Sequence, residues 1–239
     1  MSEDEKQLSN QSVDNVVTAV KGAIGAIPIA GPLIAEVAGT MIPNQRIDRI
    51  ANFAEALGRR LDGIEEQTLK TQLTNENFTD AIEESLWQAA RSTSDERREY
   101  IASILANGVE SDNIDFIETK HLLRLLGEIN DIEVVWLRAY SSEHHSDQDF
   151  RKTHSGTLTS IRVTRHSTHE EVDKAAMQES YKLHLESLGL LRSTVETHHQ
   201  IRMPVFDKKY GFIKKGYEIT PIGKLLIRFV DMVPVFDNE

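Results

Sequence analysis

The chain contains no cysteine, which excludes a disulfide framework, a thiolate nucleophile and a thiolate metal ligand. This absence fits the reducing cytoplasm, where we expect the protein to lie. The first six residues read MSEDEK and are acidic, whereas a secretory signal peptide begins with positive charge. Secretion by that route is therefore not expected.

Recognisable catalytic patterns are missing as well. No serine lies in a nucleophile elbow, and Gly22, Gly25 and Gly31 lack the lysine and the preceding strand of a phosphate loop. The histidine pairs at 144–145 and 198–199 have no cysteine or carboxylate partner at a metal-binding spacing. We therefore predict a non-enzymatic protein with no catalytic residues, no metal site and no cofactor.

Positive charge is scarce, since the formal net charge is −11 over 239 residues. This balance argues against a protein that binds nucleic acid with its whole surface. Residues 75–135 hold 14 acidic side chains against 5 lysines and arginines, a net charge of −9. Residues 198–228 hold 7 basic against 2 acidic side chains, a net charge of +5. The uneven charge predicts two modules.

Residues 23–42 form an apolar segment whose single charge is Glu36. Its twenty residues match the length of a transmembrane helix, but Pro28 and Pro32 divide it into two short helices. Two interpretations stay open: a core hairpin of a soluble bundle, or a segment released to a membrane or to another copy. The candidate membrane or self-association residues are Ile24, Ile27, Leu33, Ile34, Glu36, Val37 and Met41.

Glu36 weighs against permanent residence in lipid. A carboxylate at bilayer depth costs about 2.5–3.5 kcal/mol on insertion scales. An oligomeric pore lined by Glu36 would meet this cost, and the small residues of the segment allow close helix contact between copies. We therefore expect a homo-oligomer that associates peripherally with the inner membrane when active.

Apolar residues three and four apart predict further helices in the first half of the chain. One seam comprises Ile47, Ile50, Ala54, Leu57, Leu61 and Ile64, and the next comprises Phe78, Ile82, Leu86 and Ala90. Thr93 and Glu96 predict a capping box that opens another helix, which should stop near residues 107–108. We predict a disordered tail over 1–11 and a helical bundle over 12–112.

The second half changes in character. Helices are predicted over 117–129 and from 130 onward, followed by a polar loop over 141–173 around one weak strand near 158–164. A helix over 174–191 then precedes an alternating strand over 195–205, a return strand over 210–220, and a last helix that Pro221 begins. We predict a second domain over 113–232 and a tail over 233–239.

Helices followed by a two-stranded hairpin are typical of a winged helix. The run Leu188-Gly189-Leu190-Leu191 and residues 217–223 resemble the helix-to-wing and wing-to-helix joints of winged-helix regulators. The resemblance covers residues 117–230. The predicted fold is mainly α, with an N-terminal helical bundle that contains the apolar hairpin and a C-terminal winged-helix-like domain with a β-hairpin wing.

Nucleic-acid binding would need outward polar side chains on the second helix and cations on the wing. His184 is a further outward candidate on that helix. Charged wing tips are also common because they are solvated, so a structural or protein-docking winged helix stays open. The candidate nucleic-acid contacts are Lys174, Gln178, Lys182, Lys208, Lys209, Lys214 and Lys215.

The apolar segment and the run at 42–49 (IPNQRIDR) resemble the N-terminal regions of bacterial proteins linked to phage defence. With the run at 219–223 (ITPIG), the arrangement resembles the Abi-alpha class of abortive-infection proteins. This resemblance implies an effector or accessory factor that acts on the host membrane when infection is sensed.

The leading hypothesis is a non-enzymatic bacterial effector with a membrane-active or self-associating helical module and a winged-helix sensor or docking module. Its expected partners are further copies of itself, a membrane and an unidentified protein. The alternative is a transcriptional regulator that binds DNA through the wing and dimerises through the bundle. A scaffold with protein partners alone is the third hypothesis.

Overall fold

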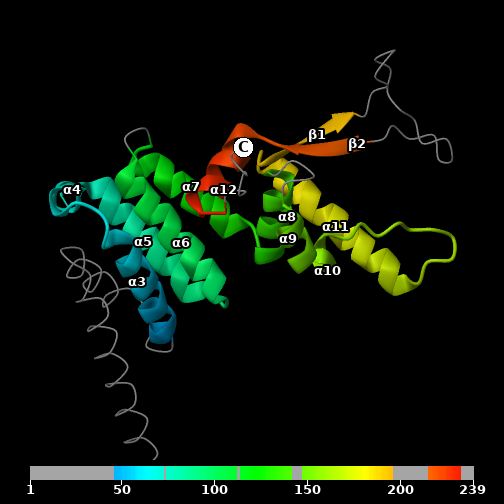
Figure 1. Ribbon diagram of the computed structural model, residues 1–239, viewed down its shortest axis with the longest axis horizontal. Helices are drawn as coiled ribbons and strands as arrows, with labels where there is room; N and C mark the ends of the chain where they lie inside the picture. Colours follow the sequence, from blue (N-terminus) through cyan, green and yellow to red (C-terminus); the bar gives the residue numbers. More distant parts are fainter. Residues whose placement is uncertain (1–45, 73, 112–113, 142–146, 196–214, 233–239) are drawn as a thin grey trace, which may run out of the picture. The chain divides into compact units, whose positions relative to one another are not determined.

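A computed structural model of the chain describes residues 46–72, 74–111, 114–141, 147–195 and 215–232 (Figure 1). These residues form ten helices and one two-stranded antiparallel sheet. The apolar segment 23–42, the predicted tails and the lysines at 208, 209 and 214 lie outside the described residues.

The described chain divides into two compact units. The first comprises residues 46–128 together with Phe229–Asp231, and the second comprises residues 129–228 together with Met232. The predicted boundary at 112/113 therefore differs from the observed one, because the helix that follows residue 113 packs with the first unit.

The described residues of the first unit form helices only, in line with the mainly helical class that was predicted. The strong apolar seams account for its longer helices, and one short helix between the first two was not predicted. Its elements are α3 (Ile47–Leu61), α4 (Glu66–Gln72), α5 (Glu76–Arg91), α6 (Asp95–Glu110) and α7 (Phe116–Glu128).

Most residues of the predicted apolar seams lie in the core of this unit, and Phe53, which those seams did not include, lies there too. Phe53 and Leu57 of α3 are buried, as are Phe78 and Leu86 of α5. α3 packs mainly against α6, and α5 packs mainly against α7. Burying a large apolar side chain of this kind contributes about 1.5–3 kcal/mol. The bundle therefore owes its stability chiefly to packing between helices.

α5 and α7 run in the same direction along their contact. The rings of Phe78 and Phe116, near the start of each helix, have centroids 4.9 Å apart. Nearer the other end, Nε2 of Gln88 donates to the carbonyl oxygen of Leu123 at 2.7 Å. The C-terminal ends of both helices consequently lie at the same end of the bundle, where α6 begins.

The predicted capping box at Thr93 is wrong by one residue. Ser94 is the N-cap of α6, and its side chain accepts a hydrogen bond from the backbone N–H of Arg97 at 3.1 Å. Gly108 does not stop the helix, which continues to Glu110. A Cβ added to Gly108 would lie 2.5 Å from Oγ1 of Thr119, so the missing side chain serves the contact between α6 and α7.

The second unit contains the remaining elements. Its helices and strands are α8 (Asp131–Ser141), α9 (Gln148–Thr153), α10 (Ser155–Leu158), α11 (His169–Ser187), β1 (Leu191–Val195), β2 (Lys215–Ile219) and α12 (Pro221–Phe229). β1 and β2 pair in antiparallel fashion, with Leu191 opposite Ile219 and Val195 opposite Lys215.

The predicted polar loop over 141–173 is wrong in part. Two short helices, α9 and α10, occupy its middle, and no strand forms at 158–164 within the described residues. The backbone there is held by Gln178, whose Nε2 donates to the carbonyl oxygen of Thr159 at 2.9 Å. α11 also begins at His169, five residues earlier than predicted, because Thr168 and Glu171 form a capping box.

α11 ends in a Schellman motif four residues before the predicted end. Gly189 has a φ of 72°, in the left-handed region that glycine adopts without strain. The N–H of Leu190 donates to the carbonyl of Leu185, and the N–H of Gly189 donates to that of Glu186, both at 2.9 Å. Leu191 thereby becomes the first residue of β1 instead of the last residue of the helix.

Candidate functional site

α11 and the β1–β2 hairpin carry those predicted nucleic-acid contacts that lie in the described residues. Lys174, Gln178 and Lys182 lie on α11, and Lys215 is the first residue of β2. The three α11 side chains do not form one exposed face, and each has a different environment.

Lys174 is exposed, as predicted, and is paired within its own helix. Its Nζ lies 2.5 Å from Oε1 of Glu170, one helical turn earlier. The hydrogen bond that Lys174 donates to Glu170, together with the negative charge of Glu170, raises the pKa of Lys174, while the same contact lowers the pKa of Glu170. Such exposed pairs contribute little stability. The pair nevertheless offsets the charge that Lys174 would present to a phosphate.

Gln178 was predicted to face outward, and this is wrong. Its side-chain amide donates to the carbonyl oxygens of Thr157 and Thr159 at 3.2 and 2.9 Å. Its Oε1 also accepts from the backbone N–H of Ile161 at 3.4 Å. Gln178 therefore holds the segment that precedes α11, where the backbone has no sheet partner.

Lys182 is likewise engaged with the fold, contrary to the outward placement predicted for it, and His184 contacts a buried carboxylate through one ring nitrogen. The side chain of Lys182 is 17% exposed, and its Nζ lies 5.2 Å from the centroid of the Trp136 ring and 3.4 Å from Oε2 of Glu179. Nδ1 of His184 lies 2.7 Å from Oε1 of the buried Glu133. The Lys182 side chain is therefore turned toward the fold, whereas the His184 side chain remains 40% exposed while it contacts Glu133.

Three aromatic side chains join α8 to the hairpin. Trp136 stacks on Tyr140 with centroids 6.2 Å apart, and Tyr140 meets Tyr217 of β2 edge-on at 6.3 Å. The hydroxyl of Tyr217 donates to Oε1 of Glu179 at 2.9 Å. Burial first, and then the hydrogen bond and charge of Glu179, raise the pKa of Tyr217. Burial is also the main cause of the raised pKa of Tyr140.

Sequence reasoning missed Glu133, which is 2% exposed on α8. Its backbone N–H donates to Oδ1 of Asn130 at 3.0 Å, and its Oε2 accepts from the backbone N–H of Asn130 at 2.8 Å. This is a capping box, and the spacing of Asn130 and Glu133 was its visible signal. His184 lies 51 residues after Glu133 in the sequence, so no local pattern could predict the contact between them.

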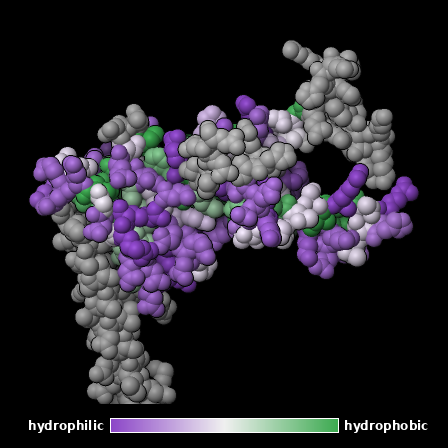
Figure 2. All heavy atoms as spheres, in the orientation of Figure 1, coloured by the Kyte–Doolittle hydropathy of each residue, from purple (hydrophilic) through white to green (hydrophobic). Residues whose placement is uncertain are grey.

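The outward surface of α11 carries an apolar stripe formed by Val172, Ala176 and Leu183. These residues are four and seven positions apart, so they share one face of the helix. Val172 is 41% exposed, Leu183 is 51% exposed, and Ala176 is exposed as well. Figure 2 shows apolar side chains at the surface beside charged ones in this part of the second unit.

Acidic residues accompany the apolar stripe. α11 contains five acidic residues and two lysines, Lys174 and Lys182, and both lysines are paired with glutamates of the same helix. The helix therefore presents exposed apolar side chains on a negatively charged surface. Large exposed apolar side chains that gather on one helical face are typical of interaction surfaces.

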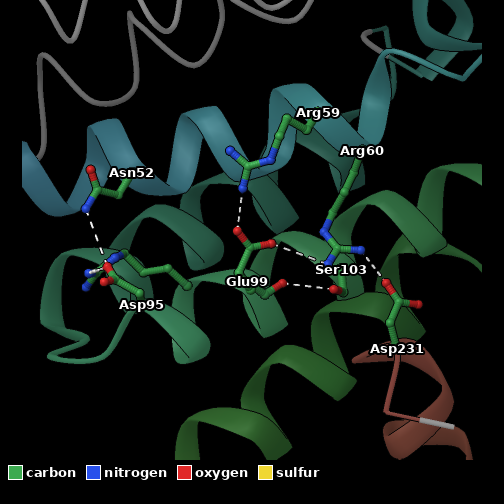
Figure 3. A network of polar contacts seen from close by, with 8 residues as sticks. Asn52, Arg59, Arg60, Asp95, Glu99, Ser103 and Asp231 are labelled. Carbon is green, nitrogen blue, oxygen red and sulfur yellow. Dashed lines mark hydrogen bonds and ion pairs between the residues drawn. The ribbon is translucent and has the colours of Figure 1, made fainter.

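A polar network in the first unit lies at the contact between α3 and α6 (Figure 3). Glu99 accepts from Arg59 at 2.5 Å and from Arg60 at 3.4 Å, and Arg60 also pairs with Asp231. Asn107 donates to the other Asp231 carboxylate oxygen at 3.1 Å. These groups are used in holding Asp231 and the bundle together, which is a structural role.

The described residues show neither a membrane span nor a metal cluster. Among the helices of that part of the chain, none has the length and hydropathy needed to cross a bilayer. No group of three or more histidine, aspartate or glutamate side chains in the same residues is arranged to hold a metal ion. Comparisons with family models, with curated proteins and with solved structures found no match to this chain.

Proposed function

We propose that this protein is a non-enzymatic bacterial effector whose second unit is a winged-helix-like docking module. In this assignment α8 and α11 are core helices, β1 and β2 form the base of the wing, and α12 closes the module. The observation that carries the proposal is the apolar stripe of Val172, Ala176 and Leu183 on an acidic α11. This surface suits a protein partner better than a DNA groove.

The charge of α11 identifies the chemistry of that partner. Binding to DNA phosphates requires cations that are not already paired. α11 carries five acidic residues and two lysines that are both paired with glutamates, so it repels the phosphates. An apolar surface rimmed by lysine or arginine would complement both the stripe and its acidic surroundings. The same negative charge disfavours pairing of α11 with α11 of a second copy. The proposed occupant is therefore a protein with a basic, apolar docking surface.

The effector role is assigned to the first module and the apolar segment 23–42. The resemblance to Abi-alpha abortive-infection proteins supports a response that acts on the cell membrane during phage infection. Ile24, Leu33 and Val37 would enter the interface or the bilayer, and Glu36 would face a watery interior or another copy. The docking module would couple this response to the sensing of infection.

Plaque counts on bacteria that express the protein test the docking role. The double variant Val172→Glu and Leu183→Glu should restore plaque numbers that the wild-type protein reduces, because both side chains are exposed and belong to the stripe. Ile132→Glu is the matched control, since Ile132 is 42% exposed on α8 and lies outside the stripe. Equal protection by the double variant would exclude docking through α11, and no protection by the wild type would exclude a defence role.

Flotation with vesicles of phosphatidylethanolamine and phosphatidylglycerol tests the membrane role. The purified wild-type chain should float with the vesicles under oligomerising conditions, and Leu33→Asp with Val37→Asp should remain at the bottom of the gradient. Failure of the wild type to float would remove the membrane part of the proposal while leaving the docking part intact.

DNA binding through the wing is the second candidate function, favoured by the four lysines Lys208, Lys209, Lys214 and Lys215 within eight residues. Replacing all four with glutamate should abolish a mobility shift of duplex DNA at low salt, while Lys174→Glu serves as the control on α11. A shift that survives the fourfold replacement, or no shift by the wild type, would exclude this function.

A further inference from the structure

A pocket of about 330 Å³ opens at the end of the helical bundle where α5 and α7 finish and α6 begins. Three arginines line it, and each comes from a different helix: Arg91 is the last residue of α5, Arg97 lies in the first turn of α6, and Arg124 lies on α7. Glu84, Gln88 and Glu128 are also among the lining residues. We call this site the arginine pocket.

The gathering of these cations is unusual for this part of the chain. Residues 75–135 contain only five lysines and arginines against 14 acidic residues, and three of the five line the arginine pocket. The other two are each engaged elsewhere, since Arg98 pairs with Asp95 and Lys120 pairs with Asp80. The fold therefore concentrates the positive charge of its most acidic stretch at one concave site.

Arg91 and Arg124 are not the groups that cap the neighbouring helix ends. Arg49 of α3 donates to the last carbonyl oxygens of α5, those of Ala90 and Arg91, at 3.1 and 3.4 Å. Nε2 of Gln88 donates to the Leu123 carbonyl oxygen of α7 and also to Oε1 of Glu84, the latter at 2.8 Å. Within the described residues, neither Arg91 nor Arg124 has a carboxylate partner in an ion pair. Helix capping thus does not account for them.

The three side chains differ in their surroundings. Arg91 is held over the Trp87 ring, with its guanidinium carbon 5.4 Å from the ring centroid. Arg91 and Arg124 are exposed to solvent, so a solute has access to both, and Arg97 is half-buried. A guanidinium offers a planar pair of donors that fits two oxygens of one phosphate or carboxylate. Glu84 and Glu128 reduce the net charge of the lining to about +1, counting ionised side chains only.

We propose that the arginine pocket binds a small molecule that carries phosphate or paired carboxylate groups. The three guanidiniums bind its oxyanions. The bound ligand links the ends of α5, α6 and α7. This site lies in the first unit, so the proposal is independent of docking through α11.

Calorimetric titration of the full chain with inorganic pyrophosphate, and separately with citrate, tests the proposal at low and constant ionic strength. The wild type should bind at least one of them saturably with one site per chain. Arg124→Gln and Arg91→Gln should each weaken binding about tenfold or more, because each removes charged hydrogen bonds to the anion. Glu128→Gln should strengthen binding, because it removes a repulsive charge.

Arg228→Gln is the matched control, since Arg228 is an exposed arginine on α12 that is not among the residues lining the pocket. Circular dichroism of each variant confirms that its helices remain. Binding of pyrophosphate alone would identify phosphate as the recognised group, and binding of citrate alone would identify paired carboxylates. Absence of saturable binding to both, or equal affinity of Arg124→Gln, Arg91→Gln and Arg228→Gln, would overturn the proposal.

Discussion

Tyr217 illustrates how a single residue serves both the hairpin and the helix behind it. Its ring contacts Tyr140 of α8, and its hydroxyl donates to Glu179 of α11. A phenolate at this position would be poorly solvated and would face a carboxylate. The folded protein therefore favours the neutral phenol, which is the physical origin of the raised pKa.

The raised pKa of Tyr217 predicts a loss of stability in alkali. Below the unfolded pKa of about 10, both states hold the proton and the stabilisation is complete. Above that pH the unfolded state loses its proton first, so stability falls as pH rises toward the folded pKa. Urea unfolding on either side of this pH should show a smaller alkaline decline in Tyr217→Phe than in the wild type. An identical decline in both proteins would contradict the assignment.

Gly223 is required by close packing in the second unit. A Cβ at this position would lie 2.4 Å from the carbonyl oxygen of Leu190 and 2.8 Å from Cγ1 of Ile219. Gly223→Ala should therefore destabilise the protein by about 1–3 kcal/mol in urea unfolding, the usual range for overpacking. Gly156→Ala is the control, because nothing lies within 4 Å of an added Cβ there. Equal stability of the two variants would show that the α12 contact relaxes freely.

At the scale of the element, the ends of α11 depend on a few local contacts. The Thr168 hydroxyl accepts from the backbone N–H of Glu171 at 3.2 Å, and the carboxylate of Glu171 accepts from the backbone N–H of Thr168 at 2.9 Å. Gly189 closes the other end. Both signals are visible in the sequence, although the start at Thr168 was overlooked because the preceding residues are polar.

Removing the N-cap should loosen the start of α11. Thr168→Ala is expected to destabilise the helix by about 1 kcal/mol and to speed amide hydrogen exchange in its first turn. Ser180→Ala, an exposed substitution in the middle of the same helix, is the control. Unchanged exchange near His169 in Thr168→Ala would indicate that tertiary contacts alone hold this end.

Helices with strong apolar periodicity were predicted to within a few residues. α3, α5, α7 and α12 belong to this class, because their buried faces repeat every three or four positions. Short elements escaped prediction, since α4, α9 and α10 have at most seven residues and too few turns for a period to emerge. At Gly108 a helix end was predicted where α6 in fact continues. A glycine required for close packing and a glycine that ends a helix cannot be distinguished from the sequence alone.

At the scale of the whole molecule, the first unit is completed by residues from the far end of the chain. Phe229 and Val230 are 5% and 3% exposed. Asn107 of α6 donates to the carbonyl oxygen of Phe229 at 3.0 Å, and Arg60 of α3 pairs with Asp231. Asp231 has a φ of 57°, a conformation that its carboxylate contacts help to hold.

This arrangement predicts that a distant substitution weakens the bundle. Phe229→Ala should cost about 3–5 kcal/mol, the usual effect of truncating a buried phenylalanine. Hydrogen exchange should rise in α3 and α6, whose residues bind the 229–231 segment. Lys224→Ala, an exposed change on the same α12, is the control. Unaltered exchange in α3 and α6 would contradict a role for the C-terminal segment in the first unit.

The sequence by itself determined the mainly helical class, most of the long helices and the hairpin with its closing helix, because these follow from local periodicity and from glycine and proline geometry. Tertiary structure decided what no local pattern contains: the placement of Phe229–Asp231 in the first unit, and the turning of Gln178 and Lys182 toward the fold. It also brought Arg91, Arg97 and Arg124 to one pocket. Such features depend on contacts between residues far apart in the chain, which form only when the helices pack.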